Sequence, residues 1–151
     1  RMKKILIILL FLASCGYKPM YVTNSTNEVS FQEIELLGDK KINRQIISAL
    51  QIIEEEYNDN LNKLSLNSEE IISETSKDSK GQVTTYRTTI RINYKVTNNG
   101  KVISKKIFNK DFSYNNKENK FDLVEYQKEI KSSLVNEIID ELIIYINLND
   151  N

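Results

Sequence analysis

The segment from Gln82 to Thr97 constrains the fold most tightly, because its side chains alternate strictly in character. Such alternation predicts a β-strand with one buried and one exposed face. Asn98-Asn99-Gly100 is a turn sequence that tolerates positive φ, so Lys101 to Tyr114 is expected to return as an antiparallel partner. The buried face would carry Tyr86, Thr88, Ile90, Ile92, Tyr94 and Val96, and the exposed face Arg87, Thr89, Arg91, Asn93 and Lys95.

Two further segments are predicted as strands with less regular patterns. Between Glu28 and Leu37 the apolar residues change parity near Gln32-Glu33, which indicates a bulge or a bend. Leu61 to Thr75 alternates less clearly, and a bulge at Asn67-Ser68 would bring its two halves into one pattern. The polar residues that follow, Ser76 to Gly81, are typical of a turn.

Apolar residues recur at helical spacing in two places. Lys40 to Asn58 predicts one helix, with Asp39 as an N-cap that can accept main-chain hydrogen bonds. Asp122 to Asn147 predicts a second, longer helix, and its last part, Ile138 to Ile146, is apolar on nearly every side. That part is either deeply buried or meets another surface. The stripe of the first helix would contain Ile42, Ile46, Ala49 or Leu50, Ile53 and Tyr57.

The order of the predicted elements is βαβββα. This order predicts an α+β domain in which two helices pack on one face of a four-stranded, mostly antiparallel sheet. The other face of the sheet would stay open, because one side of the best strand is polar. A chain of 151 residues is long enough for one such domain with a single core.

The N-terminal region has the pattern of an export signal. A basic start with Lys3 and Lys4 precedes the apolar run Ile5 to Leu12, which at about 1.5 Å per residue is too short to cross a bilayer. The single cysteine, Cys15, follows Leu12-Ala13-Ser14, which resembles the lipobox of bacterial lipoproteins. Lipidation of Cys15 would tie the protein to a membrane, and a plain signal peptide with an incidental cysteine is the alternative.

These patterns divide the chain into four parts: a lipoprotein signal peptide (1–14), a lipidated anchor and tether (15–27), an α+β domain (28–148) and a polar tail (149–151).

Removing Arg1, Lys3 and Lys4 with the signal peptide lowers the number of basic residues from 21 to 18, against 21 acidic residues. A net charge of about −3 gives no general attraction to nucleic acid, so no nucleic-acid partner is expected.

The composition also argues against an enzyme. Histidine is absent and the single cysteine would be acylated, so Ser/His and Cys/His arrangements and zinc ligand sets are unavailable. The four glycines form no phosphate-binding motif. The acidic runs Glu54-Glu55-Glu56 and Glu69-Glu70 are interpreted as solvated residues, with a carboxylate-pair hydrolase as a remote alternative. No cofactor and no metal are expected.

The remaining possibility is that the protein binds a ligand through charged residues on its surface. Arg87, Arg91 and Lys95 lie on the exposed parity of the best strand, Lys77 and Lys80 precede it, and Lys105, Lys106 and Lys110 lie on its partner. One interpretation is a basic surface for an anionic headgroup, whose phosphates would accept charge-assisted hydrogen bonds. The alternative is a set of ordinary solvated positions on an open sheet.

The segment Cys15-Gly16-Tyr17-Lys18-Pro19-Met20-Tyr21 resembles the opening of the LptE family of lipopolysaccharide-assembly lipoproteins, where leucine is commoner than Met20. Ile42-x-Arg44-Gln45-x-x-x-x-x-Leu50 is similar to the family's first helix, and Gly81-Gln82-x-x-x-Tyr86-Arg87 to its turn into the central strand. The hairpin turn, Phe112 to Tyr114 and the long last helix follow in the family's order. The resemblance covers nearly all of the chain after Ser14, with a weak match at the second strand.

The resemblance implies a lipoprotein on the periplasmic side of the outer membrane, inside the LptD β-barrel. It would support assembly of the barrel, plug its lumen and contact lipopolysaccharide (LPS) without catalysing a reaction. By position in the family pattern, Lys80 and Lys106 would contact LPS, and the strand parity adds Lys77, Arg87 and Arg91 as weaker candidates. The apolar end of the last helix would be core or barrel-facing surface. A generic outer-membrane lipoprotein of another envelope system, which binds a small ligand or a protein, is the alternative.

Overall fold

The computed structural model describes residues 29–149. The predicted signal peptide, the predicted lipidation site Cys15 and the predicted tether all lie outside the described residues. So do the last two residues of the predicted polar tail. The boundaries proposed for these parts therefore stay predictions.

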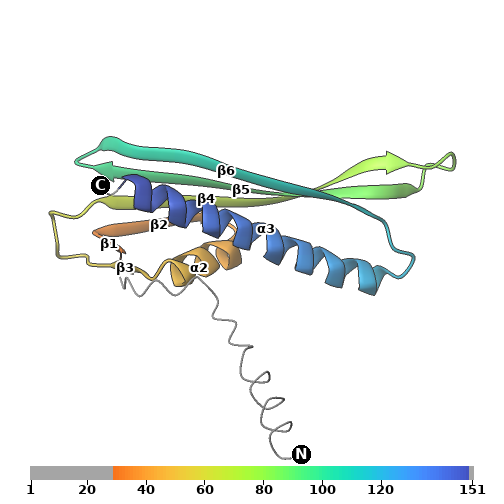
Figure 1. Cartoon of the computed structure of the whole chain (residues 1–151), viewed down its shortest axis with the longest axis horizontal. Helices are drawn as coiled ribbons and strands as arrows, with labels where there is room; N and C mark the ends of the chain where they lie inside the picture. Colours follow the sequence, from red (N-terminus) through yellow and green to blue (C-terminus); the bar gives the residue numbers. More distant parts are fainter. Residues whose placement is uncertain (1–28, 150–151) are drawn as a thin grey trace, which may run out of the picture.

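The fold is a four-stranded sheet with two helices on one face (Figure 1). The strand order is β2-β4-β5-β6, where β2 (Glu33–Gly38) runs parallel to β4 (Lys63–Lys77) and the other neighbours are antiparallel. β5 (Val83–Asn98) is central and β6 (Lys101–Asn115) forms an edge. The helices α2 (Lys40–Ala49) and α3 (Lys120–Asn149) cover one face. The predicted α+β class, element order and open second face are confirmed.

The alternation of β5 sorts its side chains as the sequence predicts. Thr88, Ile90, Ile92, Tyr94 and Val96 are buried under the helices, whereas Arg87 and Arg91 are exposed. From α3, seven residues reach the same core: Ile130, Leu134, Val135, Ile138, Ile139, Leu142 and Ile146. The hydrophobic core therefore lies between the sheet and α3, and it leaves the opposite face of the sheet free of any helix.

The first predicted strand is divided by a bend at Gln32, where the parity of its apolar residues changes. The part before the bend, β1 (Val29–Phe31), pairs in parallel with β3 (Ile52–Glu54), and the part after it joins the main sheet as β2. The bend is confirmed, but the small two-stranded sheet was not predicted. It removes Phe31 and Ile52 from solvent, and both belong to the same core as the buried residues of β5 and α3.

The first helix ends at Ala49, so the predicted end at Asn58 is wrong. Leu50 caps the helix, and Gln51 takes a positive φ of 51° that turns the chain into β3. Three glutamates follow, and carboxylates at a helix C-terminus are opposed by the helix dipole. Tyr57, which was assigned to the apolar stripe, is 95% exposed. Pairing of β3 with β1 therefore replaces two more turns of helix.

The junction between β2 and α2 is tightly fixed. Gly38 has a φ of 81°, and a Cβ at this position would lie 1.9 Å from the main-chain oxygen of Ser68. Asp39 is the N-cap, as predicted, and its Oδ1 accepts hydrogen bonds from the N–H groups of Lys41 and Ile42. Ser68 in turn donates its hydroxyl to the carbonyl of Asp39, 3.0 Å away. Only glycine fits both the backbone angle and the space at position 38.

The sheet contains register shifts at two places that the sequence did not indicate. β4 pairs regularly with β5 through Asn67 and Ser68, so the bulge predicted there is wrong. The register shifts lie near Ser76, close to the hairpin. A second shift falls between Ser104 and Val102 on β6, which leaves Ile103 without a partner on β5. Because one extra residue changes parity, Val102 lies on the other face of the sheet from Phe108, although the two are an even number of residues apart.

α3 is buried on one side between Ile130 and Ile146, whereas no residue from Lys120 to Glu129 is buried. Its apolar C-terminal part is only partly core, because Ile144 is 60% and Leu148 is 73% exposed. Of the two alternatives left open for this part, deep burial thus applies to one side of the helix only. No helix within residues 29–149 is long and apolar enough to span a membrane.

Candidate functional site

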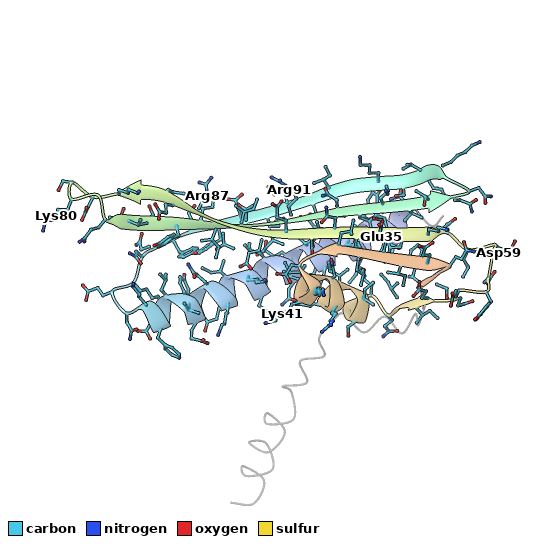
Figure 2. The ribbon with its side chains drawn as sticks, turned by 180° about the vertical axis from the view of Figure 1, so that it is seen from behind. Glu35, Lys41, Asp59, Lys80, Arg87 and Arg91 are labelled. Carbon is cyan, nitrogen blue, oxygen red and sulfur yellow. The ribbon has the colours of Figure 1, made fainter. Side chains whose placement is uncertain are left out.

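Lys80 lies at the tip of the β4–β5 hairpin, at one end of the molecule, whereas Asp59 lies at the other end (Figure 2). Asp78 holds the tip: its Oδ1 accepts hydrogen bonds from the N–H groups of Lys80 and Gln82, each 2.8 Å long. Gly81 supplies the positive φ of 79° that closes the turn. A fixed turn therefore presents Lys80 to solvent, and no side chain of residues 29–149 pairs with its ammonium group.

Lys77 stands at the end of β4 near this tip. Its Nζ lies 3.0 Å from a carboxylate oxygen of Glu74, and both side chains are about half exposed. An exposed pair of this kind contributes about 0 to 1 kcal/mol, so an anionic ligand could displace the glutamate at small cost.

Arg87 and Arg91 project from the open face of the sheet, on the side of β5 that faces away from the helices (Figure 2). Arg87 bonds Ser113 and lies 3.5 Å from a carboxylate oxygen of Asp111 on β6. Arg91 lies 3.5 Å from a carboxylate oxygen of Glu69 on β4. Both guanidinium groups are therefore partly compensated and still open to solvent.

Lys106 lies on the opposite, helix-covered face. It pairs with Tyr94 in the register of β5 and β6, and its Nζ is 4.7 Å from the ring centroid of Tyr145 on α3. The aromatic ring attracts the ammonium group and holds it beside the C-terminal part of α3. On the same face, Lys110 pairs with Glu141 of α3, which raises the pKa of that lysine through the hydrogen bond and the charge of the carboxylate.

The predicted basic residues thus occupy three separate places. Lys80 and Lys77 share the hairpin tip, Arg87 and Arg91 share the open face, and Lys106 lies under α3. Carboxylates of the neighbouring strands interrupt the open face, so the sheet carries mixed charge rather than one continuous basic surface. The hairpin tip and the open arginines are the positions at which an anionic headgroup could bind by exchanging ion-pair partners.

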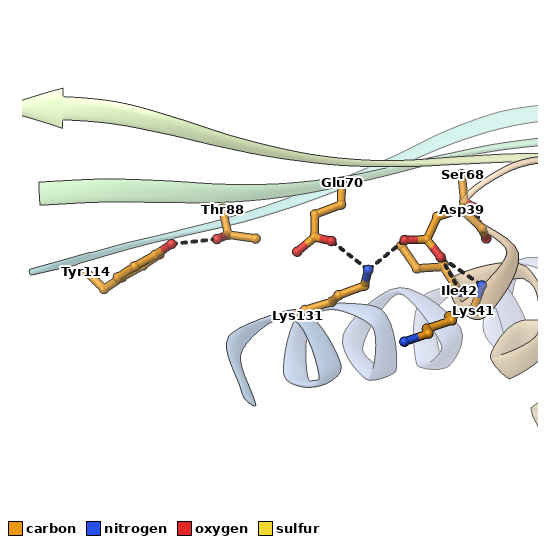
Figure 3. A network of polar contacts seen from close by, with 8 residues as sticks. All are labelled: Asp39, Lys41, Ile42, Ser68, Glu70, Thr88, Tyr114 and Lys131. Atoms are coloured by element: carbon orange, nitrogen blue, oxygen red, sulfur yellow. Dashed lines mark hydrogen bonds and ion pairs between the residues drawn. The ribbon is translucent and has the colours of Figure 1, made fainter. Parts of the chain in front are cut away.

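A polar network that the sequence analysis missed joins three elements (Figure 3). The ammonium group of Lys131 on α3 donates to Oδ2 of Asp39 at the start of α2 and to Oε2 of Glu70 on β4, each 2.6 Å away. All three side chains are less than 26% exposed. Farther along the sheet, Tyr114 shares a hydrogen bond with the buried Thr88 and accepts one from Gln127 of α3. The sequence does contain a signal for this network. Lys131 lies three and four residues before the core residues Leu134 and Val135, which places a lysine next to the buried side of the helix.

The network shifts the pKa values of two of its members. Burial alone would raise the pKa of Asp39, but the hydrogen bonds from Lys131, Ile42 and Lys41 and the nearby ammonium charge hold it below the ordinary value. Burial would lower the pKa of Lys131, yet its hydrogen bonds and attraction to Asp39 and Glu70 raise it above the ordinary value. Both groups therefore stay charged at neutral pH, and the network connects α2, β4 and α3 electrostatically.

A shallow groove of about 350 Å³ runs beside this network, between α2, β4 and α3. Its apolar walls include Ile72 and Val124, and its polar rim includes Lys41, Lys128 and Lys131. Lys131 pairs with two carboxylates and Lys128 with Glu125, so of these three lysines only Lys41 lacks an ion-pair partner within residues 29–149. Within residues 29–149 no cluster of metal-ligating side chains is present.

The family comparison decides what kind of protein carries these features. The family model described as "LptE: Lipopolysaccharide-assembly" matches residues 17–146, most of the chain. This chain belongs to the LptE family. The resemblance noted from the Cys15 to Tyr21 segment and from the pattern of the sheet is thereby confirmed. No curated protein sequence matches the chain.

Solved structures with the LptE-like fold include three lipoproteins. Rare lipoprotein B from Shewanella oneidensis aligns with a TM-score of 0.62 at 13% identity, over 78% of this chain and 96% of that one. A minor lipoprotein from Acinetobacter baumannii aligns with a TM-score of 0.55 at 11% identity, over 81% and 95% of the two chains. A lipoprotein from Caulobacter crescentus gives 0.50 at 12% identity, over 78% and 88%. At such identities the likeness concerns the fold.

Proposed function

We propose that this protein is an outer-membrane LPS-assembly lipoprotein that partners an LptD-like β-barrel, supports its assembly, plugs its lumen and contacts LPS. The observation that carries the proposal is the family match over residues 17–146. The absence of histidine and of a free catalytic thiol in the described residues is consistent with a protein that binds rather than catalyses. A lipid on Cys15 would hold the domain at the periplasmic side of the membrane.

LPS is an anionic lipid, so its contacts are expected at exposed cations. Lys80 is the strongest candidate, because the fixed hairpin presents it to solvent and its ammonium group has no ion-pair partner within residues 29–149. Arg87 and Arg91 can each exchange a 3.5 Å carboxylate contact for a phosphate, which accepts two parallel hydrogen bonds from a guanidinium group. Lys77 adds a cation near the tip. Lys106, held over Tyr145, would contribute from the other face beside the apolar end of α3.

The barrel partnership can be tested by extraction of the tagged protein in mild detergent. A large outer-membrane protein is expected to copurify with it. Recovery as a free monomer would favour the alternative, a lipoprotein of another envelope system. A parallel sample with Cys15→Ala should leave the membrane fraction or remain unprocessed. Normal fractionation of that variant would contradict the lipid anchor.

LPS contact can be tested with labelled LPS and the purified protein. Lys80→Asp combined with Lys106→Asp is expected to weaken binding about tenfold or more, since each reversed contact typically contributes about 1 kcal/mol. Lys40→Asp combined with Lys120→Asp reverses the same charge at exposed positions that have no side-chain partner in the described part of the chain, and serves as the control. Equal binding by the two double variants, with unchanged melting temperatures, would remove Lys80 and Lys106 from the site.

A further inference from the structure

The two edge strands of the main sheet, β2 and β6, differ in length and in whether a side chain bonds to their main chain. β2 has six residues, and the main-chain N–H of Ile34 on this strand donates to Oε1 of Glu54, 3.0 Å away. β6 has 15 residues, and no side-chain hydrogen bond formed within residues 29–149 reaches its main chain. About half of the main-chain groups of an edge strand point away from its single neighbour. β6 therefore offers a long row of groups with which another strand can pair.

Apolar side chains flank the first half of this edge. Val102, Ile103 and Ile107 are 58%, 57% and 57% exposed, although β-branched residues of this size are usually covered. Ile103 lies at the register shift, so no residue of β5 stands opposite it. Three such side chains beside an open row of N–H and C=O groups are the features that a bound extended segment would cover.

The charge along the same half is positive. Lys105 stands directly opposite Lys95 on β5, and Lys101 follows the turn between the two strands. None of these three lysines has an ion-pair partner within residues 29–149. Farther along β6 the charges are compensated, because Lys110 pairs with Glu141 and Asp111 lies near Arg87. Uncompensated positive charge is thus concentrated between Lys101 and Ile107.

This charge selects among possible occupants of the edge. Pairing of β6 with β6 of a second copy would bring lysine-rich strands together, and like charges on facing strands are destabilising. A segment with acidic side chains would instead convert the same lysines into cross-strand ion pairs. The same lysines therefore disfavour pairing with a second copy and favour an acidic partner. Many specific interfaces combine attraction to one partner with repulsion of others in this way.

We propose that the free edge of β6, from Lys101 to Asn109, binds an extended segment of a partner protein in which acidic and apolar residues share one face. Main-chain hydrogen bonds would add this segment to the sheet as a fifth strand beside β6. On the open face Lys105 and Ile107 are two residues apart, so an acidic side chain of the segment would lie near Lys105 and the next side chain on that face, an apolar one, would cover Ile107. Lys101 and Ile103, at the turn and at the register shift, extend this surface. The inference goes beyond LPS contact and does not rest on it.

The test uses the full chain, purified in mild detergent, and a synthetic peptide of about ten residues in which glutamate and valine take turns at every second position, with threonine at the positions between them, so that both lie on one face. Fluorescence anisotropy measures binding, and amide hydrogen exchange locates it. The peptide is expected to bind and to slow exchange between Lys101 and Asn109. A lysine–valine peptide and a fully N-methylated glutamate–valine peptide are expected not to bind, because the first has the wrong charge and the second cannot donate main-chain hydrogen bonds.

Matched variants connect the binding to this edge. Lys101→Glu combined with Lys105→Glu is expected to weaken binding of the acidic peptide about tenfold, since two cross-strand charge pairs are reversed. Lys40→Glu combined with Lys120→Glu makes the same change in net charge at exposed positions outside Lys101 to Asn109 and should bind the peptide as the parent does. Melting temperatures check that all variants are folded.

Several results would overturn the proposal. These are equal binding of the acidic and basic peptides, retained binding of the N-methylated peptide, protection outside Lys101 to Asn109, or equal loss in both double variants. Concentration-dependent self-association that protects β6 without any peptide would assign the edge to a second copy instead. Failure of the barrel to copurify would count against the proposed function only, because the peptide assay contains no barrel.

Discussion

Alternate residues of the same strands meet two different environments in this molecule. On the covered face, charged groups are held by α3: Lys110 pairs with Glu141, and Lys131 bonds two carboxylates at 2.6 Å. On the open face, Arg87 and Arg91 lie 3.5 Å from their carboxylates and are about half exposed. The contrast shows that charges near the helices serve the fold, whereas those of the open face are free to exchange partners.

The largest difference between the faces should appear in apolar truncations. Ile90→Ala removes a fully buried side chain beneath α3 and is expected to lower the free energy of unfolding by about 3 to 4 kcal/mol, through lost transfer energy and a residual cavity. Ile107→Ala on the open face, where the side chain is 57% exposed, should cost about 1 kcal/mol or less. Urea denaturation measures both, and similar losses would show that the open face is covered in solution.

A smaller effect is expected from the Lys131 network. Lys131→Met keeps the aliphatic chain but leaves the carboxylates of Asp39 and Glu70 close together without a counter-charge, which should cost about 2 to 3 kcal/mol. Lys128→Met, three residues earlier on the same helix, removes only an exposed pair with Glu125 and should change stability by about 0.5 kcal/mol or less. Denaturation in urea compares the two. Equal losses would mean that the network is no stronger than a surface pair.

The same network predicts how the stability difference between the parent and Lys131→Met depends on pH. The lowered pKa of Asp39 stabilises the fold above its ordinary value of 3.8, and this contribution is lost as pH falls through the folded-state pKa. The raised pKa of Lys131 stabilises below 10.5, and that contribution is lost as pH rises through the folded-state pKa. The difference should therefore be constant between about pH 5 and 9 and shrink on both sides. A difference that changes steadily across neutral pH would contradict this assignment.

The smallest effects belong to the open-face carboxylates. Glu69→Gln combined with Asp111→Asn frees Arg91 and Arg87, and each lost pair should cost only about 0.2 to 1 kcal/mol of stability. If the arginines contact LPS, the double variant should bind labelled LPS about two- to fivefold more tightly, because no carboxylate competes with phosphate. Glu125→Gln, on the exposed side of α3, is the control. Unchanged LPS affinity in the double variant would remove both arginines from the binding site.

Most of the fold could be predicted because its strongest signals are local. The alternation of β5 and the helical spacing of α3 determine their own buried faces, and Gly38-Asp39 marks a helix start. The end of α2 could not be predicted in this way. The apolar spacing of Ile53 and Tyr57 continues the helical pattern. The structure departs from this pattern because β3 pairs with β1, a strand that lies far from it in the sequence.

The sequence could predict which residues of the candidate site are exposed cations, but not which residues lie next to one another. The parity of β5 correctly placed Arg87 and Arg91 on the exposed face, yet nothing local to the sequence shows that Asp111 and Glu69 stand beside them. Cross-strand neighbours depend on register, and the shift near Ile103 also moved Val102 to the other face. Lys106 and Arg91 therefore looked like members of one surface, although they lie on opposite faces.

The joint between β2 and α2 has a consequence for sequence variation in the family. At Gly38 a side chain would collide with the carbonyl of Ser68, Asp39 must both cap α2 and accept from Lys131, and Glu70 shares that lysine. These demands join residues that are far apart in the chain into a single pattern: Gly-Asp, then Ser-x-Glu about thirty residues later, then a lysine on an otherwise apolar stripe of the last helix. Relatives that keep this joint should change at these positions together or not at all, which gives a way to align family members whose overall identity is too low to align them residue by residue.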